Sequence, residues 1–291
     1  LYDCVRINIK RGTRTNVYNP INRIHMKKKQ IGLALGSGAM RGYALIPIIK
    51  GLEKEGIEIA AVSGSSVGAL IGAYYALYGE VDTLFEFSKN LPKKNYVKLV
   101  DPNNPKISLI KGEKVKKFLA DNFFHDRSFK DTKIPLVICA VDLFGRKPVY
   151  MSTGKIVEAV MASISIPGLV PPYRMNHKYY VDGGILDPVP VNPLFDMGLG
   201  KVVGANLMGY KLETKKQERD LFPTMVQTFY MMMEQLAKRK GNQKLFMLNL
   251  SFKPDPASML AFYKWKEPYE AGQTAINSNI KSLKNWLHTH A

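Results

Sequence analysis

The residues that first suggest chemistry are Gly64-Ser65-Ser66-Val67-Gly68, which follow an apolar run and precede a stretch of small residues. A serine at the centre of Gly-x-Ser-x-Gly is typical of a nucleophile elbow, a sharp strand-to-helix turn that exposes the serine hydroxyl. Gly64 and Gly68 would remove side chains where strand and helix cross closely. Ser66 is therefore predicted to be a nucleophile. The alternative is a serine that caps the next helix, which would not need both glycines.

A second glycine-rich turn, Gly36-Ser37-Gly38-Ala39-Met40-Arg41-Gly42, follows a short apolar run at residues 30–35. Between a strand and a helix, such a turn directs backbone N–H groups at one point beside the positive end of the helix dipole. It could bind a phosphate or stabilise an oxyanion. A dinucleotide-binding Gly-x-Gly-x-x-Gly pattern would need glycine in place of Arg41, so nucleotide binding ranks below oxyanion stabilisation.

The third segment is Asp182-Gly183-Gly184, an acidic residue at the end of an apolar strand. Asp-Gly is also a common turn dipeptide, so a role for Asp182 depends on a partner. A serine nucleophile needs a general base within hydrogen-bond reach. The histidines weighed for this role stand at a hairpin tip, after a surface helix and in a terminal tail: His177, His125, His288 and His290. Such positions are typical of solvated histidines, which leaves Asp182 as the direct partner of Ser66.

The elements expected to position these residues alternate between strands and helices. Strands are predicted at residues 30–35, 57–62, 134–141, 201–207 and 245–252, with a hairpin at residues 173–181. Helices are predicted at residues 43–55, 67–77, 81–89, 113–123, 156–163, 222–240 and 269–287, and a loop that could act as a lid at residues 92–105. This order predicts a three-layer α/β/α sandwich with a mainly parallel central sheet. Sites in such sheets gather at the carboxyl ends of strands.

Length and composition fit one large domain. The chain has 291 residues, of which 46% are hydrophobic, enough for a substantial core. Residues 1–25 are interpreted as a leader, a tag or a disordered extension, and residues 26–291 as the domain. Cys4 and Cys139 have no metal or disulfide spacing, which favours a reducing, cytoplasmic setting. No apolar stretch reaches the ~18 residues expected of a membrane-spanning helix.

The formal net charge is +18, from 42 Lys and Arg residues against 24 Asp and Glu residues. This excess has two interpretations. It could reflect solvated helix faces, or it could attract the protein to the periphery of an anionic membrane. No motif with interleaved aromatic residues indicates nucleic-acid binding.

The three glycine-rich motifs together resemble those of the bacterial type of patatin-like phospholipase. Two proline-rich segments also match that pattern, Pro167-Gly168…Pro171-Pro172 and Pro188-Val189-Pro190-Val191. The similarity covers roughly residues 29–280. The resemblance implies a patatin-like α/β fold and a serine acyl hydrolase that needs neither metal nor cofactor. Its substrates would be lipid esters: phospholipids, lysophospholipids or simple carboxylic esters.

The resemblance also implies roles for individual residues. Ser66 and Asp182 would form a catalytic dyad. The N–H groups of three residues would form the oxyanion hole, with a fourth residue supporting it: Gly36, Ser37 and Gly38, with Arg41. The glycines expected to support the motifs are Gly64, Gly68, Gly183 and Gly184. Ser37 departs from the family pattern, in which the middle residue of this turn is often glycine.

Other functions remain open at this stage. The same dyad could transfer an acyl group or cleave a thioester, and the glycine-rich turn could belong to a non-enzymatic membrane- or phosphate-binding module. Acyl chain length, head group, positional specificity and oligomeric state are not encoded in any motif of the sequence.

Overall fold

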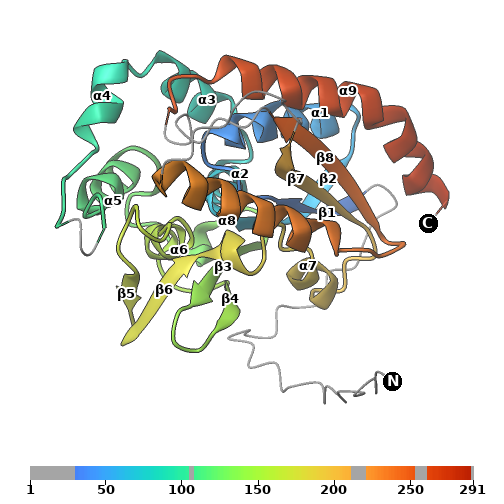
Figure 1. Ribbon diagram of the computed structural model, residues 1–291. Coiled ribbons are helices and arrows are strands. Elements are labelled where there is room, and N and C mark those ends of the chain that lie inside the picture. Colours follow the sequence, from blue (N-terminus) through green and yellow to red (C-terminus); the bar gives the residue numbers. More distant parts are fainter. Residues whose placement is uncertain (1–29, 105–107, 211–220, 253–260, 290–291) are drawn as a thin grey trace, which may run out of the picture.

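The computed structural model describes residues 30–104, 108–210, 221–252 and 261–289 (Figure 1). Residues 1–25, interpreted from the sequence as a leader, a tag or a disordered extension, lie outside these ranges, and so does His290. The strands are β1 (Gln30–Leu35), β2 (Glu58–Ser65), β3 (Leu136–Asp142), β4 (Lys147–Met151), β5 (Tyr173–Met175), β6 (Lys178–Asp182), β7 (Val202–Tyr210) and β8 (Leu245–Phe252).

All eight strands belong to one sheet, in the order β5-β6-β3-β2-β1-β7-β8, with β4 paired to β3. The pairs β3–β2, β2–β1, β1–β7 and β7–β8 are parallel. The pairs that involve β4, β5 and β6 are antiparallel. The predicted mainly parallel sheet is confirmed, with an antiparallel extension at one side.

The α-helices are α1 (Leu45–Lys54), α2 (Val67–Tyr78), α3 (Asp82–Asn90), α4 (Lys93–Lys98), α5 (Glu113–Leu119), α6 (Ile156–Ser163), α7 (Asn192–Asp196), α8 (Leu221–Lys238) and α9 (Lys266–Thr289). Short 3-10 turns are η1 (Ala39–Ala44), η3 (Phe129–Asp131) and η4 (Gly183–Ile185), and η2 (Ala120–Phe124) is a π-helical turn. In Figure 1, α8 crosses in front of the sheet and α9 runs along its top.

Alternation along the strands explains the three layers. Ile31, Leu33 and Leu35 of β1 belong to one buried cluster, and Ala34 belongs to a second cluster on the other face. Successive strand residues point to opposite faces, and every residue of β1 is buried, so this strand must be covered on both sides. The larger cluster includes residues of α1, α2 and α9, and the smaller one includes Leu194 of α7 and Ala237 of α8. The predicted three-layer α/β/α sandwich is thereby confirmed.

Two predicted local structures differ from the structure. The stretch predicted as a loop at residues 92–105 begins with α4, and the predicted helix at residues 43–55 begins earlier, as η1. The sequence Lys-Lys-Asn-Tyr-Val-Lys of α4 has no helical apolar repeat of its own, and the helix is held by tertiary contacts of Tyr96. Among the helices of the described residues, none is both long and apolar enough to cross a membrane.

Candidate active site

Ser66 stands at the junction of β2 and α2 in a strained backbone conformation. Its φ is 56° and its ψ is −126°, a region that few residues other than glycine adopt. The Ser66 N–H donates to Ser163 Oγ at 2.8 Å, and the Ser163 hydroxyl donates to the Cys139 carbonyl at 2.6 Å. This chain of hydrogen bonds ties the turn to α6 and β3. No sequence signal indicated the contribution of Ser163.

The two glycines of the motif allow α2 to pack closely against β2 and against the end of β1. A Cβ atom on Gly64 would lie 2.3 Å from the Gly68 carbonyl oxygen, and a Cβ atom on Gly68 would lie 2.2 Å from the Leu35 carbonyl oxygen. Both contacts are with backbone, which cannot swing aside as a side chain could. The glycines are therefore required for the geometry of this turn.

The structure brings the side chains of Ser66 and Asp182 together. The Ser66 hydroxyl donates to Asp182 Oδ2 at 2.5 Å, and the Gly184 N–H donates to Asp182 Oδ1 at 2.7 Å. Each of the two residues is 5% exposed. Burial disfavours the charged carboxylate and raises the pKa of Asp182 to about 6, although both hydrogen bonds act in the opposite direction. The carboxylate is thus a stronger base than an exposed aspartate.

The antiparallel extension of the sheet explains how residues 116 positions apart meet. On β3, Ile138 pairs with both Gly64 and Met151, and Ala140 pairs with both Val149 and Asp182. A strand has one neighbour on each side. Because β4 pairs with Ile138 and with Ala140 on one side of β3, β2 and β6 must share the other side. The carboxyl ends of β2 and β6 therefore meet head to head along one side of β3.

Gly183 and Gly184, which follow Asp182, leave no room for a side chain. A Cβ atom on Gly183 would lie 2.2 Å from the Cys139 carbonyl oxygen, and one on Gly184 would lie 2.5 Å from Ser37 Oγ. The Ser37 hydroxyl is buried, and no described residue forms a hydrogen bond with it. Gly184 thus lets the glycine-rich turn after β1 pack against the chain that follows Asp182. Cys139 is fully buried and forms no disulfide bond.

Two of the three N–H groups expected to form the oxyanion hole already donate hydrogen bonds to backbone carbonyls. The Gly36 N–H donates to the Ala205 carbonyl at 3.0 Å, and the Ser37 N–H donates to the Pro188 carbonyl at 2.9 Å. These two groups are therefore committed to the backbone, contrary to the oxyanion role expected for them. Within the described ranges, the N–H groups of Gly38 and Ala39 have no acceptor.

Arg41, expected to support the oxyanion hole, is buried on the far side of the turn. Its guanidinium donates to the Leu207 carbonyl at 3.1 Å and lies 4.5 Å from the ring centre of Tyr230 and 5.1 Å from that of Phe252. Arg41 thus joins η1 to β7, α8 and β8. These contacts stabilise the position of the glycine-rich turn.

Ser66 forms part of the wall of an apolar cavity of about 260 Å³. The cavity extends from η1 and the start of α2 towards α3, α4 and α5. Its lining is almost entirely aliphatic and aromatic, with representative side chains Met40, Leu70, Phe85, Phe118 and Ile164. No sequence motif predicted this cavity, because its walls come from separate elements that only the fold brings together.

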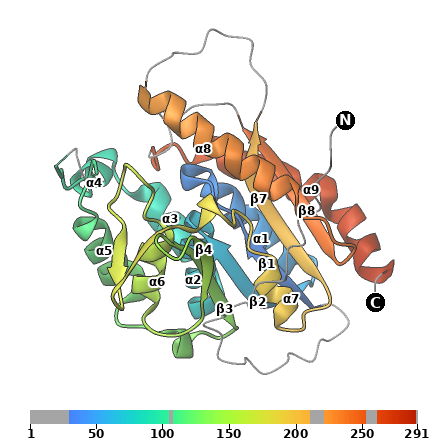
Figure 2. The same ribbon diagram turned by 60° about the horizontal axis from the view of Figure 1, so that its bottom comes forward.

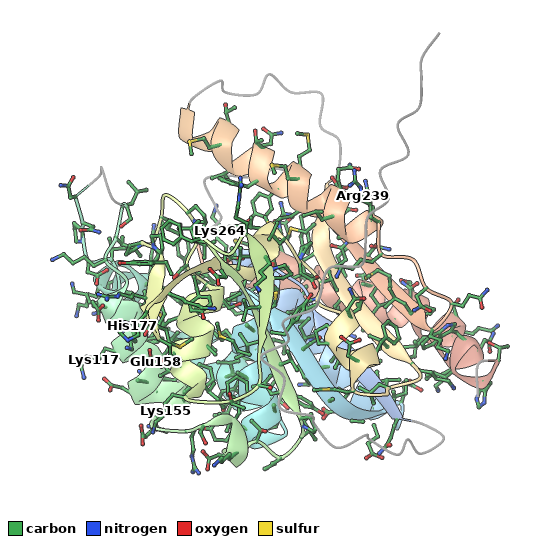
Figure 3. The ribbon with its side chains drawn as sticks, turned by 90° about the horizontal axis from the view of Figure 1, so that it is seen from below. Lys117, Lys155, Glu158, His177, Arg239 and Lys264 are labelled. Carbon is green, nitrogen blue, oxygen red and sulfur yellow. The ribbon has the colours of Figure 1, made fainter. Side chains whose placement is uncertain are left out.

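The histidines of the described chain take no part in this arrangement. His125, His177 and His288 are exposed, and none forms a hydrogen bond with Ser66 or Asp182. His177 lies at the tip of the β5–β6 hairpin, near the left edge of the molecule in Figure 3. No group of three or more histidine, cysteine, aspartate or glutamate side chains within the described ranges could hold a metal ion.

Comparisons with known proteins agree with this architecture. Residues 33–195 match the model of a family described as patatin-like phospholipase. An uncharacterized NTE family protein of Mycobacterium bovis is 33% identical over 180 residues, which cover 62% of this chain and 49% of that protein. A lysophospholipase of Aspergillus fumigatus is 28% identical over 173 residues, covering 58% of this chain and 11% of that protein.

A third relative is the neuropathy target esterase of Drosophila melanogaster, 26% identical over 199 residues, which cover 66% of this chain and 14% of that protein. The chain thus spans about half the length of the mycobacterial relative and a much smaller part of the other two. The matched segment includes both Ser66 and Asp182.

Proposed function

Because the chain belongs to the patatin-like phospholipase family, we propose that it hydrolyses acyl esters of lipids with Ser66 as nucleophile and Asp182 as general base. The observation that carries this proposal is the buried hydrogen bond of 2.5 Å between Ser66 Oγ and Asp182 Oδ2, at the wall of an apolar cavity. The names of two relatives, a lysophospholipase and an esterase, are consistent with an ester substrate.

The first half of the reaction forms an acyl-enzyme. Asp182 accepts the proton of the Ser66 hydroxyl as its oxygen attacks the ester carbonyl carbon. The carbonyl oxygen becomes an oxyanion, and the N–H groups of Gly38 and Ala39 are the donors available to stabilise it, since those of Gly36 and Ser37 are already bonded. The N-terminus of α2, which begins directly after Ser66, adds the positive end of its dipole. The C–O bond then breaks, and the alcohol leaves with the proton held by Asp182.

The second half releases the acid. A water molecule gives a proton to Asp182 and attacks the acyl carbonyl carbon, and Ser66 leaves with that proton restored to its oxygen. The apolar cavity would hold the acyl chain during both steps, because its lining offers few hydrogen-bond partners to a sugar, a peptide or a phosphate. The head group of the lipid would remain outside the cavity.

The Ser66→Ala variant tests the nucleophile. We expect it to lose at least about 10³-fold in hydrolysis of p-nitrophenyl esters and to lose all labelling by a fluorophosphonate probe. The matched control is Ser65→Ala, which removes a neighbouring buried hydroxyl that has no hydrogen-bond partner among the described residues. If Ser66→Ala kept labelling, or if Ser65→Ala lost it, the assignment of Ser66 would be wrong.

A further inference from the structure

Residues 93–117 are strongly basic. They contain eight lysines and two acidic residues, a net charge of +6 out of +18 for the whole chain. One of the two acids is not available on the surface, because Asp101 is buried and accepts hydrogen bonds from the N–H groups of Gly112 and Lys114, each at 3.0 Å. Glu113 is the other acid and is exposed.

The described part of this segment forms one structural unit. An antiparallel bridge joins Pro102 to Ile110, and the Lys111 N–H donates to the Asp101 carbonyl at 2.9 Å. These contacts bring the end of α4 beside the start of α5. Figures 1 and 2 both show α4 and α5 at the end of the molecule opposite the C-terminal end of α9. Figure 3 shows Lys117 of α5 at the outer edge.

The outer side of this unit combines cations with exposed apolar side chains. Lys94, Lys98 and Lys111 are exposed, and no carboxylate among the described residues pairs with them. Between them in the chain, Val100 is 45% exposed and Leu109 is 46% exposed. We refer to these five residues as the lysine rim.

The inner side of the same unit belongs to the cavity that contains Ser66. Tyr96 and Leu99 come from α4 and its end, and Val115 and Phe118 come from α5. The Tyr96 hydroxyl donates to the Ser88 carbonyl at 2.7 Å, which fixes α4 against α3. Val100 of the lysine rim also lines this cavity, so the rim and the cavity lining are continuous on one short stretch of chain.

We propose that the lysine rim docks the protein on an anionic lipid bilayer and so places the cavity against the source of its substrate, an inference that rests on the proposed function. Lysines next to an anionic membrane attract its phosphate groups, and exposed apolar side chains gain free energy by entering the interface. Continuity with an apolar cavity favours a bilayer over nucleic acid, whose phosphates would satisfy the lysines but not Val100 and Leu109. An acyl chain could pass from the bilayer to Ser66 without crossing water.

The test replaces three lysines of the rim together, Lys94→Gln, Lys98→Gln and Lys111→Gln, in a Ser66→Ala background so that the vesicles remain intact. Binding is measured by co-sedimentation with phosphatidylcholine vesicles that contain phosphatidylglycerol. We expect binding to weaken about 100-fold, from the attraction lost at three lysines. The matched control is Lys54→Gln, Lys244→Gln and Lys281→Gln, an equal change of charge on α1, in the turn before β8 and on α9, which should weaken binding far less.

A second variant tests the apolar part of the rim. Val100→Ser with Leu109→Ser should weaken binding by about 10-fold or more on anionic and neutral vesicles alike, because both side chains are proposed to enter the interface. Circular dichroism and the unfolding temperature of each variant establish that it is folded. Normal vesicle binding by the rim variants, or an equal loss in the control triple, would overturn the proposal.

The proposed function is judged by a separate measurement. Hydrolysis of a soluble short-chain ester by the parent protein needs no bilayer, so its absence would count against the hydrolase and not against the docking surface. Loss of vesicle binding in the rim variants is likewise measured without any turnover. The two proposals can therefore fail independently.

Discussion

At the level of single residues, the proposed reaction depends on the ionisation of Asp182. Burial raises its pKa to about 6, and the general base of the reaction must be ionised to accept the Ser66 proton. We expect kcat/KM for a soluble ester to be low at pH 5 and to rise through an apparent pKa of about 6. Initial rates across this range in buffers of constant ionic strength measure it. A midpoint near 4, the value of an exposed aspartate, would contradict this account of the base.

The same burial predicts a conflict between activity and stability. The folded protein holds the Asp182 proton more tightly than the unfolded chain does, so the unfolded chain releases it first as the pH rises. The free energy of unfolding therefore falls between pH 4 and pH 6, and above pH 6 the buried charge costs about 3 kcal/mol, from a pKa that rises from 3.8 to about 6.

Asp182→Asn removes this charge, and its amide could still accept from Gly184 and donate to Ser66 Oγ. We expect the variant to lose about 10²–10⁴-fold in kcat, yet to be more stable than the parent at pH 8 and equal to it near pH 4. Urea unfolding at the two pH values measures the difference. Equal stabilisation at both pH values would show that the charge of Asp182 is not its source.

At the level of elements, the close packing at the junction of β2 with α2 depends on glycines, which have no side chain. In Gly68→Ala the new Cβ atom would lie 2.2 Å from the Leu35 carbonyl oxygen, so α2 must move away from β1. We expect at least about 1–3 kcal/mol of lost stability and a large loss of ester hydrolysis, because Ser66 would move with the helix. Thermal unfolding and initial rates measure both effects.

The matched control for that change is Gly241→Ala, since nothing lies within 4 Å of a Cβ atom at that position. Its stability and activity should match those of the parent. A Gly68→Ala variant that behaved like the control would mean that α2 packs loosely against the end of β1, and the structural reason for a glycine at position 68 would be lost.

The elements also show which parts of the candidate site the sequence could predict. The strand-turn-helix setting of Ser66 and the hairpin before Asp182 are local patterns, and both were predicted. The head-to-head meeting of β2 and β6 depends on pairing with β3, which no local pattern encodes. Likewise, the commitment of the Gly36 N–H to Ala205 joins residues 169 positions apart. Long-range pairing therefore decided which amides remain available, and the expectation for Gly36 and Ser37 failed at that point.

At the level of the whole molecule, the segment that matches the family ends at residue 195, but the structure continues the sheet beyond it. Strand β7 pairs with β1 on the side opposite β2 and accepts the Gly36 N–H through Ala205. Helix α9 packs against η1 and α1 so closely that a Cβ atom on Gly272 would lie 2.2 Å from the Ala44 carbonyl oxygen. Arg41 is enclosed by rings from α8 and β8.

These contacts predict that the matched segment cannot fold alone. A fragment of residues 26–200 retains Ser66 and Asp182 but exposes an edge of β1 and the apolar face of α1, so we expect neither cooperative unfolding nor fluorophosphonate labelling. Its control, residues 26–291, removes only residues 1–25, interpreted from the sequence as a leader, a tag or a disordered extension, and should keep the activity and unfolding temperature of the full chain. Near-ultraviolet circular dichroism, thermal melts and labelling distinguish the two. A folded, labelled 26–200 fragment would mean that β7, β8, α8 and α9 are dispensable, and that the glycine-rich turn is set by the matched segment alone.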